Sequence, residues 1–221
     1  MKLNTYIDHT LLKPTATKAE IINLCDEAKK HLFFSVCVNS SYVKLAKKEL
    51  KKSGVKVCSV IGFPLGAMST KAKVAETKQA LKDGAQEIDM VLNIGLLKSG
   101  DFKAVQKDIK KVKKAMGKKT LKVILETCLL TDEEITKASE LAIAAKADFI
   151  KTSTGFSTGG ATFNAVKLMK AVAGKKAKIK ASGGIRDAKK VKEYIALGVS
   201  RIGTSSGIAI VTDGVAKKGE Y

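Results

Sequence analysis

Two lysines that follow apolar segments are the residues of this sequence best suited to chemistry. Lys151 follows Phe149 and Ile150 and enters a loop rich in Ser, Thr and Gly, and Lys180 ends the next apolar segment. The ends of neighbouring parallel strands lie about 4.8 Å apart, so the two amino groups can approach closely. A buried lysine is costly unless it has a partner or a function. The alternative for Lys151 is a side chain that extends from the strand end into solvent.

Carbonyl chemistry is the reaction type that a close lysine pair favours. Only a neutral amine attacks a carbonyl carbon, and an ordinary lysine is neutral in about one molecule in 2,500 at pH 7. Two neighbouring ammonium groups repel each other, which should lower the pKa of at least one of them. The pattern therefore predicts a lysine nucleophile that forms a Schiff base.

An aspartate interrupts a third apolar segment. Asp89 lies in the middle of residues 87–92, whose other members are mostly apolar. A buried carboxylate needs a cationic partner, which Lys180 or Lys151 can supply. Asp89 is then suited to carrying protons to and from reacting carbons. The alternative is an ion pair that neutralises a polar interior without taking part in chemistry.

Two glycine-rich loops follow the last two predicted strands. One contains Gly183 and Gly184, and the other contains Gly203, Ser205 and Ser206. Barrel enzymes commonly bind phosphate on the backbone N–H groups of these two loops. Either loop alone is a weak signal, because Gly and Ser are common in turns. Together they predict a phosphate site.

The elements that must position these residues alternate regularly along the chain. Eight β-rich segments are separated by longer amphipathic segments, with a period of about 25 to 30 residues, which is typical of successive βα units. Thr17 and Thr131 each precede a glutamate by three residues, as in helix capping boxes. We therefore predict an α/β fold, a (β/α)8 TIM barrel, as a single domain over residues 1–221. The predicted strands cover residues 6–8, 33–38, 55–61, 87–92, 121–126, 148–152, 177–181 and 201–203.

The formal net charge of +20 raises the question of nucleic-acid binding. Nearly all basic residues are lysines, with Arg186 and Arg201 as the arginines, and the chain is 5% aromatic without Trp. Nucleic-acid sites favour arginine and stacking aromatics. We expect solvated helix faces and no specific nucleic-acid partner. A nonenzymatic protein that binds polyanions is the alternative from a different functional class.

Cysteines and histidines give no recognisable metal site in the sequence. The four cysteines are widely spaced without a Cys-x-x-Cys pair, and there are two histidines. We therefore expect no metal and no cofactor. The apolar segments are too short to span a membrane and the N-terminus lacks a secretory pattern, which predicts a cytoplasmic protein. A homodimer is compatible with the sequence, which does not define the oligomeric state.

Five motifs in order along the chain resemble the deoxyribose-phosphate aldolase family. They are residues 7–14, 35–38, 87–91, 149–156 and 180–186. The resemblance implies a class I aldolase of deoxyribose catabolism, which reversibly cleaves 2-deoxy-D-ribose 5-phosphate to acetaldehyde and D-glyceraldehyde 3-phosphate. It gives the Schiff base to Lys151 and proton transfer to Asp89 and Lys180. The substrate-binding positions that it implies are Asp8, Cys37, Thr154, Gly155, Gly183, Gly184, Gly203, Ser205 and Ser206.

Two of the residues at matching positions have alternative explanations. Cys37 also fits as a small buried hydrophobic residue, which is the interpretation we favour. Tyr221 ends the chain, as a tyrosine does in members of the family, and its phenol could assist proton transfer beside the imine. The alternative for Tyr221 is a frayed terminus without function. A different Schiff-base aldolase or a sugar-phosphate isomerase remains the competing enzyme class, because many barrels share the phosphate loops.

Overall fold

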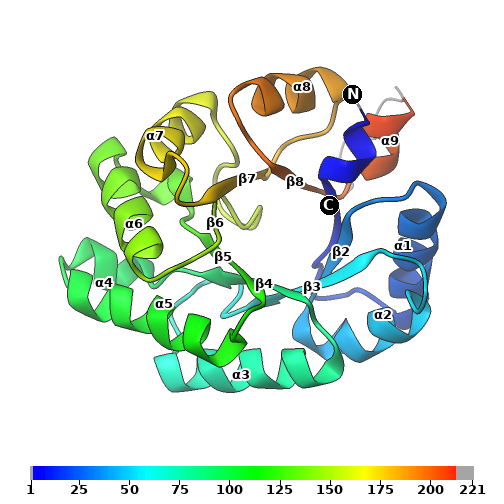
Figure 1. The fold of residues 1–221 in the computed structure, drawn as a ribbon, viewed down its shortest axis with the longest axis horizontal. Coiled ribbons are helices and arrows are strands. Elements are labelled where there is room, and N and C mark those ends of the chain that lie inside the picture. Colours follow the sequence, from blue (N-terminus) through cyan, green and yellow to red (C-terminus); the bar gives the residue numbers. More distant parts are fainter. Residues whose placement is uncertain (1, 213–221) are drawn as a thin grey trace.

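The computed structural model describes residues 2–212 of the chain. Eight parallel strands form a closed barrel in which each strand pairs with its neighbours in sequence and β8 pairs with β1. Figure 1 shows the barrel end on, with the helices in a ring around it. The (β/α)8 prediction is confirmed. The strands are β1 (Ile7–Leu11), β2 (Ser35–Val38), β3 (Lys56–Ile61), β4 (Glu87–Val91), β5 (Thr120–Ile124), β6 (Phe149–Lys151), β7 (Lys178–Ser182) and β8 (Arg201–Thr204).

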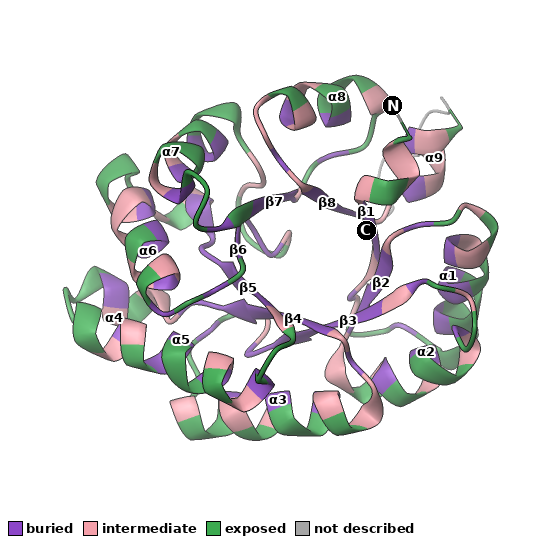
Figure 2. Cartoon of the chain, viewed as in Figure 1, coloured by how far each residue is buried: buried purple, intermediate pink, exposed green. Residues whose placement is uncertain are grey.

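Helices connect the strands and cover the outside of the barrel. They are α1 (Lys18–Lys30), α2 (Val43–Glu49), α3 (Thr70–Asp83), α4 (Ile94–Lys98), α5 (Phe102–Met116), α6 (Asp132–Ala144), α7 (Phe163–Ala173), α8 (Ala188–Ala196) and α9 (Gly207–Val211). Short 3-10 turns are η1 (Leu3–Tyr6), η2 (Ser40–Tyr42) and η3 (Thr127–Leu129). Figure 2 shows the buried strands and the exposed outer faces of the helices.

Both predicted capping boxes are present. The Thr17 hydroxyl accepts from the N–H of Glu20, whose carboxylate accepts from the N–H of Thr17 at 2.7 Å. Thr131 and Glu134 repeat the arrangement at the start of α6. Each box pairs helix-start N–H groups that otherwise lack a partner. The two boxes therefore mark the beginnings of α1 and α6 in the sequence itself.

The first strand is the least accurate of the sequence predictions. It was expected at residues 6–8, whereas β1 extends over Ile7–Leu11 and places His9 and Thr10 inside the sheet. Three consecutive polar residues, Asp8, His9 and Thr10, conceal the strand in the sequence. His9 Nε2 pairs with a Glu27 carboxylate oxygen at 2.7 Å, and the Thr10 hydroxyl donates to the carbonyl of Asp8 at 2.8 Å.

Strand register brings ionisable residues together inside the barrel. Asp89 is the Cα partner of Lys122, and Lys151 is the Cα partner of Lys180. Lys180 in turn faces Arg201 on β8. Barrel interiors are usually filled by layers of branched aliphatic side chains. This departure from the usual filling marks the interior as the place to look for a functional site.

Candidate active site

Asp89 is the central carboxylate of the barrel interior. Its Oδ2 accepts hydrogen bonds from Lys151 Nζ at 2.9 Å and from Lys180 Nζ at 2.8 Å. Its Oδ1 accepts from Lys122 Nζ at 2.9 Å and from Cys58 Sγ at 3.1 Å. The side chain is fully buried. The structure thus brings the three residues with predicted catalytic roles into direct contact, with Asp89 between the two lysines.

Asp8 anchors the other side of Lys180. Its Oδ2 accepts from Lys180 Nζ at 2.5 Å, and its Oδ1 accepts from Arg201 at 2.7 Å and from the Ser35 hydroxyl at 2.6 Å. Lys180 therefore lies between two carboxylates, Asp8 and Asp89, and is itself fully buried. A lysine held in this way has a fixed position and little freedom to approach a substrate directly.

Lys122, Glu87 and Arg201 also belong to this site and were not predicted from the sequence. Lys122 Nζ binds Glu87 Oε2 at 2.5 Å, and Arg201 binds the same oxygen at 3.3 Å. All three side chains are buried. The available signal was the one that identified Asp89, because Lys122 also interrupts an apolar strand, between Leu121 and Val123.

Two carboxylates determine the direction in which the pKa of Lys180 is shifted. Burial alone would lower it, but the carboxylates of Asp8 and Asp89 outweigh desolvation and hold the pKa of Lys180 well above its ordinary value. Repulsion between the two lysines was predicted to lower the pKa of at least one of them, and Lys180 is not that one. Lys180 is therefore a permanent cation at neutral pH.

The pKa values of Asp89 and Asp8 are shifted downward, in the opposite direction to that of Lys180. Burial alone would raise the pKa of Asp89, yet Lys122, Lys151 and Lys180 hold it well below the ordinary value. The pKa of Asp8 is also lowered, because Lys180 and Arg201 outweigh the effect of burial. Both carboxylates are thus ionised across the physiological pH range.

A charge count shows which base can be neutral. The buried network contains three carboxylates (Asp8, Glu87 and Asp89) and four basic groups (Lys122, Lys151, Lys180 and Arg201). One base can therefore lose its proton without leaving a carboxylate uncompensated. Lys151 has a single carboxylate contact, to an oxygen that it shares with Lys180. Lys151 therefore has the fewest carboxylate contacts of the four bases.

A pocket opens above this network at the carboxyl ends of the strands. Its empty volume is about 490 Å³, including the solvent at its mouth. Of the four bases, Lys151 lines the pocket and is 2% exposed, whereas Lys180 lies beneath it. The lining residues are Thr10, Leu12, Lys151, Thr154, Ser182, Gly183, Gly184, Ile185, Arg186, Gly203, Thr204 and Ser205.

The positions in the two predicted phosphate loops require glycine for different physical reasons. Gly183 and Gly184 have positive φ values of 88° and 74°, which favour glycine. A Cβ on Gly183 would also lie 2.8 Å from the Cα of Gly160. At Gly203 a Cβ would lie 2.9 Å from Cε of Lys180. Gly203 therefore leaves room for the buried lysine, whereas Gly183 and Gly184 shape the pocket wall.

The remaining predicted substrate residues fall into two groups. Thr154 lines the pocket, and its hydroxyl donates to the carboxylate of Glu126, which also accepts from the N–H of Thr154 at 3.2 Å. Asp8 and Cys37 are fully buried and are not among the lining residues. Gly155 and Ser206 also lie outside the lining, although both border it in sequence. Glu126, which holds Thr154 in place, was not predicted from the sequence.

Arg186 lines the pocket and is exposed, so it is a cationic group available to an anionic substrate that was not predicted as a site residue. Tyr221, with its proposed proton transfer, lies outside the described residues.

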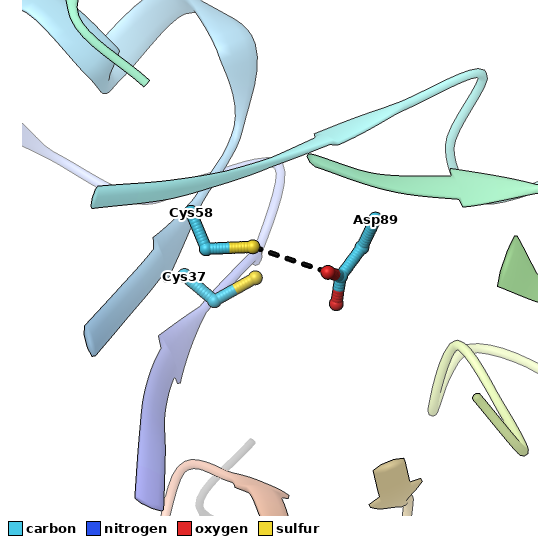
Figure 3. Close-up of side chains that lie close together, drawn as sticks. All are labelled: Cys37, Cys58 and Asp89. Atoms are coloured by element: carbon cyan, nitrogen blue, oxygen red, sulfur yellow. Dashed lines mark hydrogen bonds between the residues drawn. The ribbon is translucent and has the colours of Figure 1, made fainter. Parts of the chain in front are cut away.

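Cys37, Cys58 and Asp89 form a group with the donor types of a metal site. One donor atom from each lies within 4.8 Å of the others, and Figure 3 shows the two sulfurs and the carboxylate facing one another. Both Asp89 oxygens already accept from lysines, and Lys122 Nζ lies 3.4 Å from Cys58 Sγ. A divalent cation here would lie against these ammonium groups, which repel it. The electrostatics of the group therefore disfavour a dication.

The barrel is closed, and one lysine of its buried charged network, Lys151, lines a pocket with glycines in its wall. These features define a (β/α)8-barrel enzyme. Comparison with known families makes the class specific. The chain belongs to the DeoC/LacD family of aldolases, whose model matches residues 2–213. The resemblance to the deoxyribose-phosphate aldolase family is thereby confirmed.

Individual relatives agree over nearly the full length. The deoxyribose-phosphate aldolase of Finegoldia magna is 59% identical over 211 residues, covering 96% of this chain and 99% of the relative. That of Streptococcus uberis is 54% identical and covers both chains completely. The crystal structure of a putative deoxyribose-phosphate aldolase from Coccidioides immitis superposes with a TM-score of 0.94 at 42% identity, covering 96% of this chain and 85% of the other.

Within residues 2–212, none of the helices is both long enough and apolar enough to cross a bilayer.

Proposed function

We propose that this protein reversibly cleaves 2-deoxy-D-ribose 5-phosphate to acetaldehyde and D-glyceraldehyde 3-phosphate, through a Schiff base on Lys151. The observation that carries the proposal is the position of Lys151, which is bound to the buried Asp89 on one side and lines the pocket on the other. The deoxyribose-phosphate aldolases among its relatives support the choice of substrate.

The first step is attack of the neutral Lys151 amine on the C1 aldehyde of the open-chain sugar. The resulting carbinolamine loses water and leaves a cationic imine. This cation accepts the electron pair of the C2–C3 bond when that bond breaks, as the C3 hydroxyl gives up its proton to the carboxylate of Asp89. D-Glyceraldehyde 3-phosphate leaves, and C1 and C2 remain on the enzyme as an enamine.

Asp89 and Lys180 carry out the proton transfers of these reaction steps in our proposal. Asp89 Oδ2 contacts the nitrogen that becomes the imine, so its negative charge stabilises the cation as it forms. Lys180 binds the same oxygen and holds a proton beside the reacting centre. Protonation of the enamine at C2 and hydrolysis then release acetaldehyde and restore the amine of Lys151.

The pocket wall supports binding of the phosphate end of the substrate. Turns at Gly183 and Gly184 present backbone without side chains, and Arg186 adds a positive charge on the same side. Arginine forms two parallel hydrogen bonds with phosphate oxygens. Anchoring the phosphate there would hold the C1 end of the sugar near Lys151, which converts binding energy into orientation.

Product analysis tests the proposed reaction. Incubation with 2-deoxy-D-ribose 5-phosphate should yield acetaldehyde and a triose phosphate in equal amounts, and the variant Lys151→Met should yield neither. A sugar-phosphate isomerase would release no acetaldehyde, because the aldose–ketose reaction requires a hydroxyl at C2 that 2-deoxyribose lacks. Unchanged substrate would exclude the aldol cleavage.

A phosphorylated metabolite and four free cysteines support the cytoplasm as the site of the reaction. The homodimer remains a prediction, which sedimentation of the full chain tests.

A further inference from the structure

Two thiols face each other inside the barrel beside the proposed catalytic network. Cys37 on β2 and Cys58 on β3 are Cα partners in the parallel ladder, and neighbouring strands lie about 4.8 Å apart. The sulfurs and a carboxylate oxygen of Asp89 all lie within 4.8 Å of one another. Figure 3 shows both side chains extending in the same direction, toward Asp89. One small atom can therefore bind both sulfurs without a change in the backbone.

The pair shares the neighbouring residue Leu12 with the pocket. Both thiols are fully buried in a small apolar cluster with Leu12 and Val60, and the half-buried Phe63 packs against this cluster. Leu12 is also one of the residues that line the pocket. A small solute in the pocket is thus separated from the two sulfurs by side chains rather than by the barrel wall.

The two thiols are chemically unequal. The neighbouring Cys58 lowers the pKa of the Cys37 thiol, and the nearby Lys180 favours its thiolate as well. Burial raises the pKa of Cys58 well above its ordinary value. Cys37 is therefore the nucleophile that reacts first, and Cys58 is the neighbour that can complete a second bond.

Local charge selects the kind of ligand that this pair accepts. Lys122 Nζ lies 3.4 Å from Cys58 Sγ, and Lys151 and Lys180 bind the adjacent oxygen of Asp89. A free divalent cation is repelled by these three groups, whereas a neutral molecule with an affinity for sulfur is not.

We propose that Cys37 and Cys58 form a binding site for a trivalent arsenical, for which neutral arsenous acid, As(OH)₃, is the probe. Two As–S bonds form and two As–O bonds break, and each thiol proton leaves with one hydroxide as water. The product is a bridged Cys37–As(OH)–Cys58 adduct, and no oxidant or reductant is needed. This site is separate from the sugar-phosphate pocket in residues and in chemistry.

Occupation of the site changes the surroundings of Asp89. Cys58 Sγ donates to Asp89 Oδ1 at 3.1 Å, and that hydrogen bond is lost when the sulfur binds arsenic. The adduct should therefore inactivate the enzyme while leaving the phosphate loops open. Only the activity readout of this proposal rests on the proposed function, because adduct formation is measured directly.

Intact-mass and peptide mapping of the full-length protein with arsenous acid provide the test. We expect one arsenic per chain, located on the peptides that contain Cys37 and Cys58, with loss of turnover that a small dithiol reverses. Cys58→Ser and Cys37→Ser should each weaken arsenic retention by about 100-fold or more, because the second As–S bond is intramolecular. Cys128→Ser, which removes the half-exposed thiol, is the matched control and should retain arsenic normally.

Three results would overturn the proposal. The first is arsenic mapped to Cys25 or Cys128 in the wild-type protein. The second is undiminished retention in both single variants at the pair. The third is cadmium bound as tightly as arsenic, because it would contradict the charge argument. Adduct formation in a protein that does not cleave 2-deoxyribose 5-phosphate would still support the site and would reject only the proposed function.

Discussion

Replacing Lys122 with methionine tests the charge count that leaves Lys151 as the neutral base. Lys122 is fully buried and lies outside the pocket lining, so the substitution alters charge without altering the pocket wall. The network then contains three carboxylates and three basic groups. Loss of the Lys151 proton would leave one carboxylate uncompensated. We therefore expect Schiff-base formation to move to higher pH.

The size of the shift follows from the geometry at Asp89. Lys122 and Lys151 each bind an opposite oxygen of this carboxylate at 2.9 Å. Two ammonium groups about 6 Å apart repel by roughly 3 kcal/mol at an effective dielectric constant of about 20. One pH unit corresponds to about 1.4 kcal/mol, so the profile should move by roughly two units toward alkaline pH. Loss of the buried cation should also cost about 3 to 5 kcal/mol of unfolding free energy.

The assay is the rate of borohydride-trapped adduct with acetaldehyde as a function of pH. Lys73→Met is the matched control, because Lys73 is an equally buried lysine that pairs with Asp108 at 2.7 Å on the outside of the barrel. The control should lose comparable stability and keep the wild-type pH profile. An unshifted profile in Lys122→Met, or an equal shift in Lys73→Met, would refute the electrostatic reasoning.

Three further predictions concern acid stability, the phosphate and the C-terminus. Asp8 and Asp89 have lowered pKa values in the folded state, so their contribution to the unfolding free energy should be fully present above about pH 5 and fall as the pH drops below about 4. The loss should be up to about 1.4 kcal/mol per pH unit for each group. Urea unfolding at a series of pH values measures this, and an unfolding free energy that does not change with pH would contradict it. Arg186→Ala should lower kcat/KM for 2-deoxyribose 5-phosphate about tenfold or more and leave that for unphosphorylated 2-deoxyribose unchanged, whereas equal losses for both would remove Arg186 from the phosphate site. Deletion of Tyr221 should leave trapping on Lys151 unchanged and slow hydrogen–deuterium exchange at the acetaldehyde methyl group, and exchange at the full rate would exclude Tyr221 from proton transfer.

The features that could be predicted from the sequence are those that a short segment shows by itself. Asp89 and Lys151 are charged residues in apolar strands, so each indicated a buried partner before the fold was known. Thr17 and Thr131 marked helix starts because a capping box is a local arrangement. The number of βα units then followed from their period.

The features that could not be predicted depend on which residues meet across the barrel. Glu87 and Arg201 are 114 residues apart, and nothing in either segment indicates that they share a hydrogen bond. The same holds for Lys180 and Asp8, which are 172 residues apart. The raised pKa of Lys180 is a consequence of that second contact. The sequence predicted that repulsion lowers the pKa of at least one of the two lysines, and at Lys180 a distant carboxylate outweighs that repulsion.

The central claim is that the amine of Lys151 forms the covalent bond to the substrate. Its most direct test is mass spectrometry of the protein after borohydride reduction in the presence of acetaldehyde, followed by peptide mapping. We predict one reduced two-carbon adduct per chain, located on Lys151, and none in Lys151→Met. An adduct on Lys180, or one confined to the exposed lysines of the helices, would contradict the account.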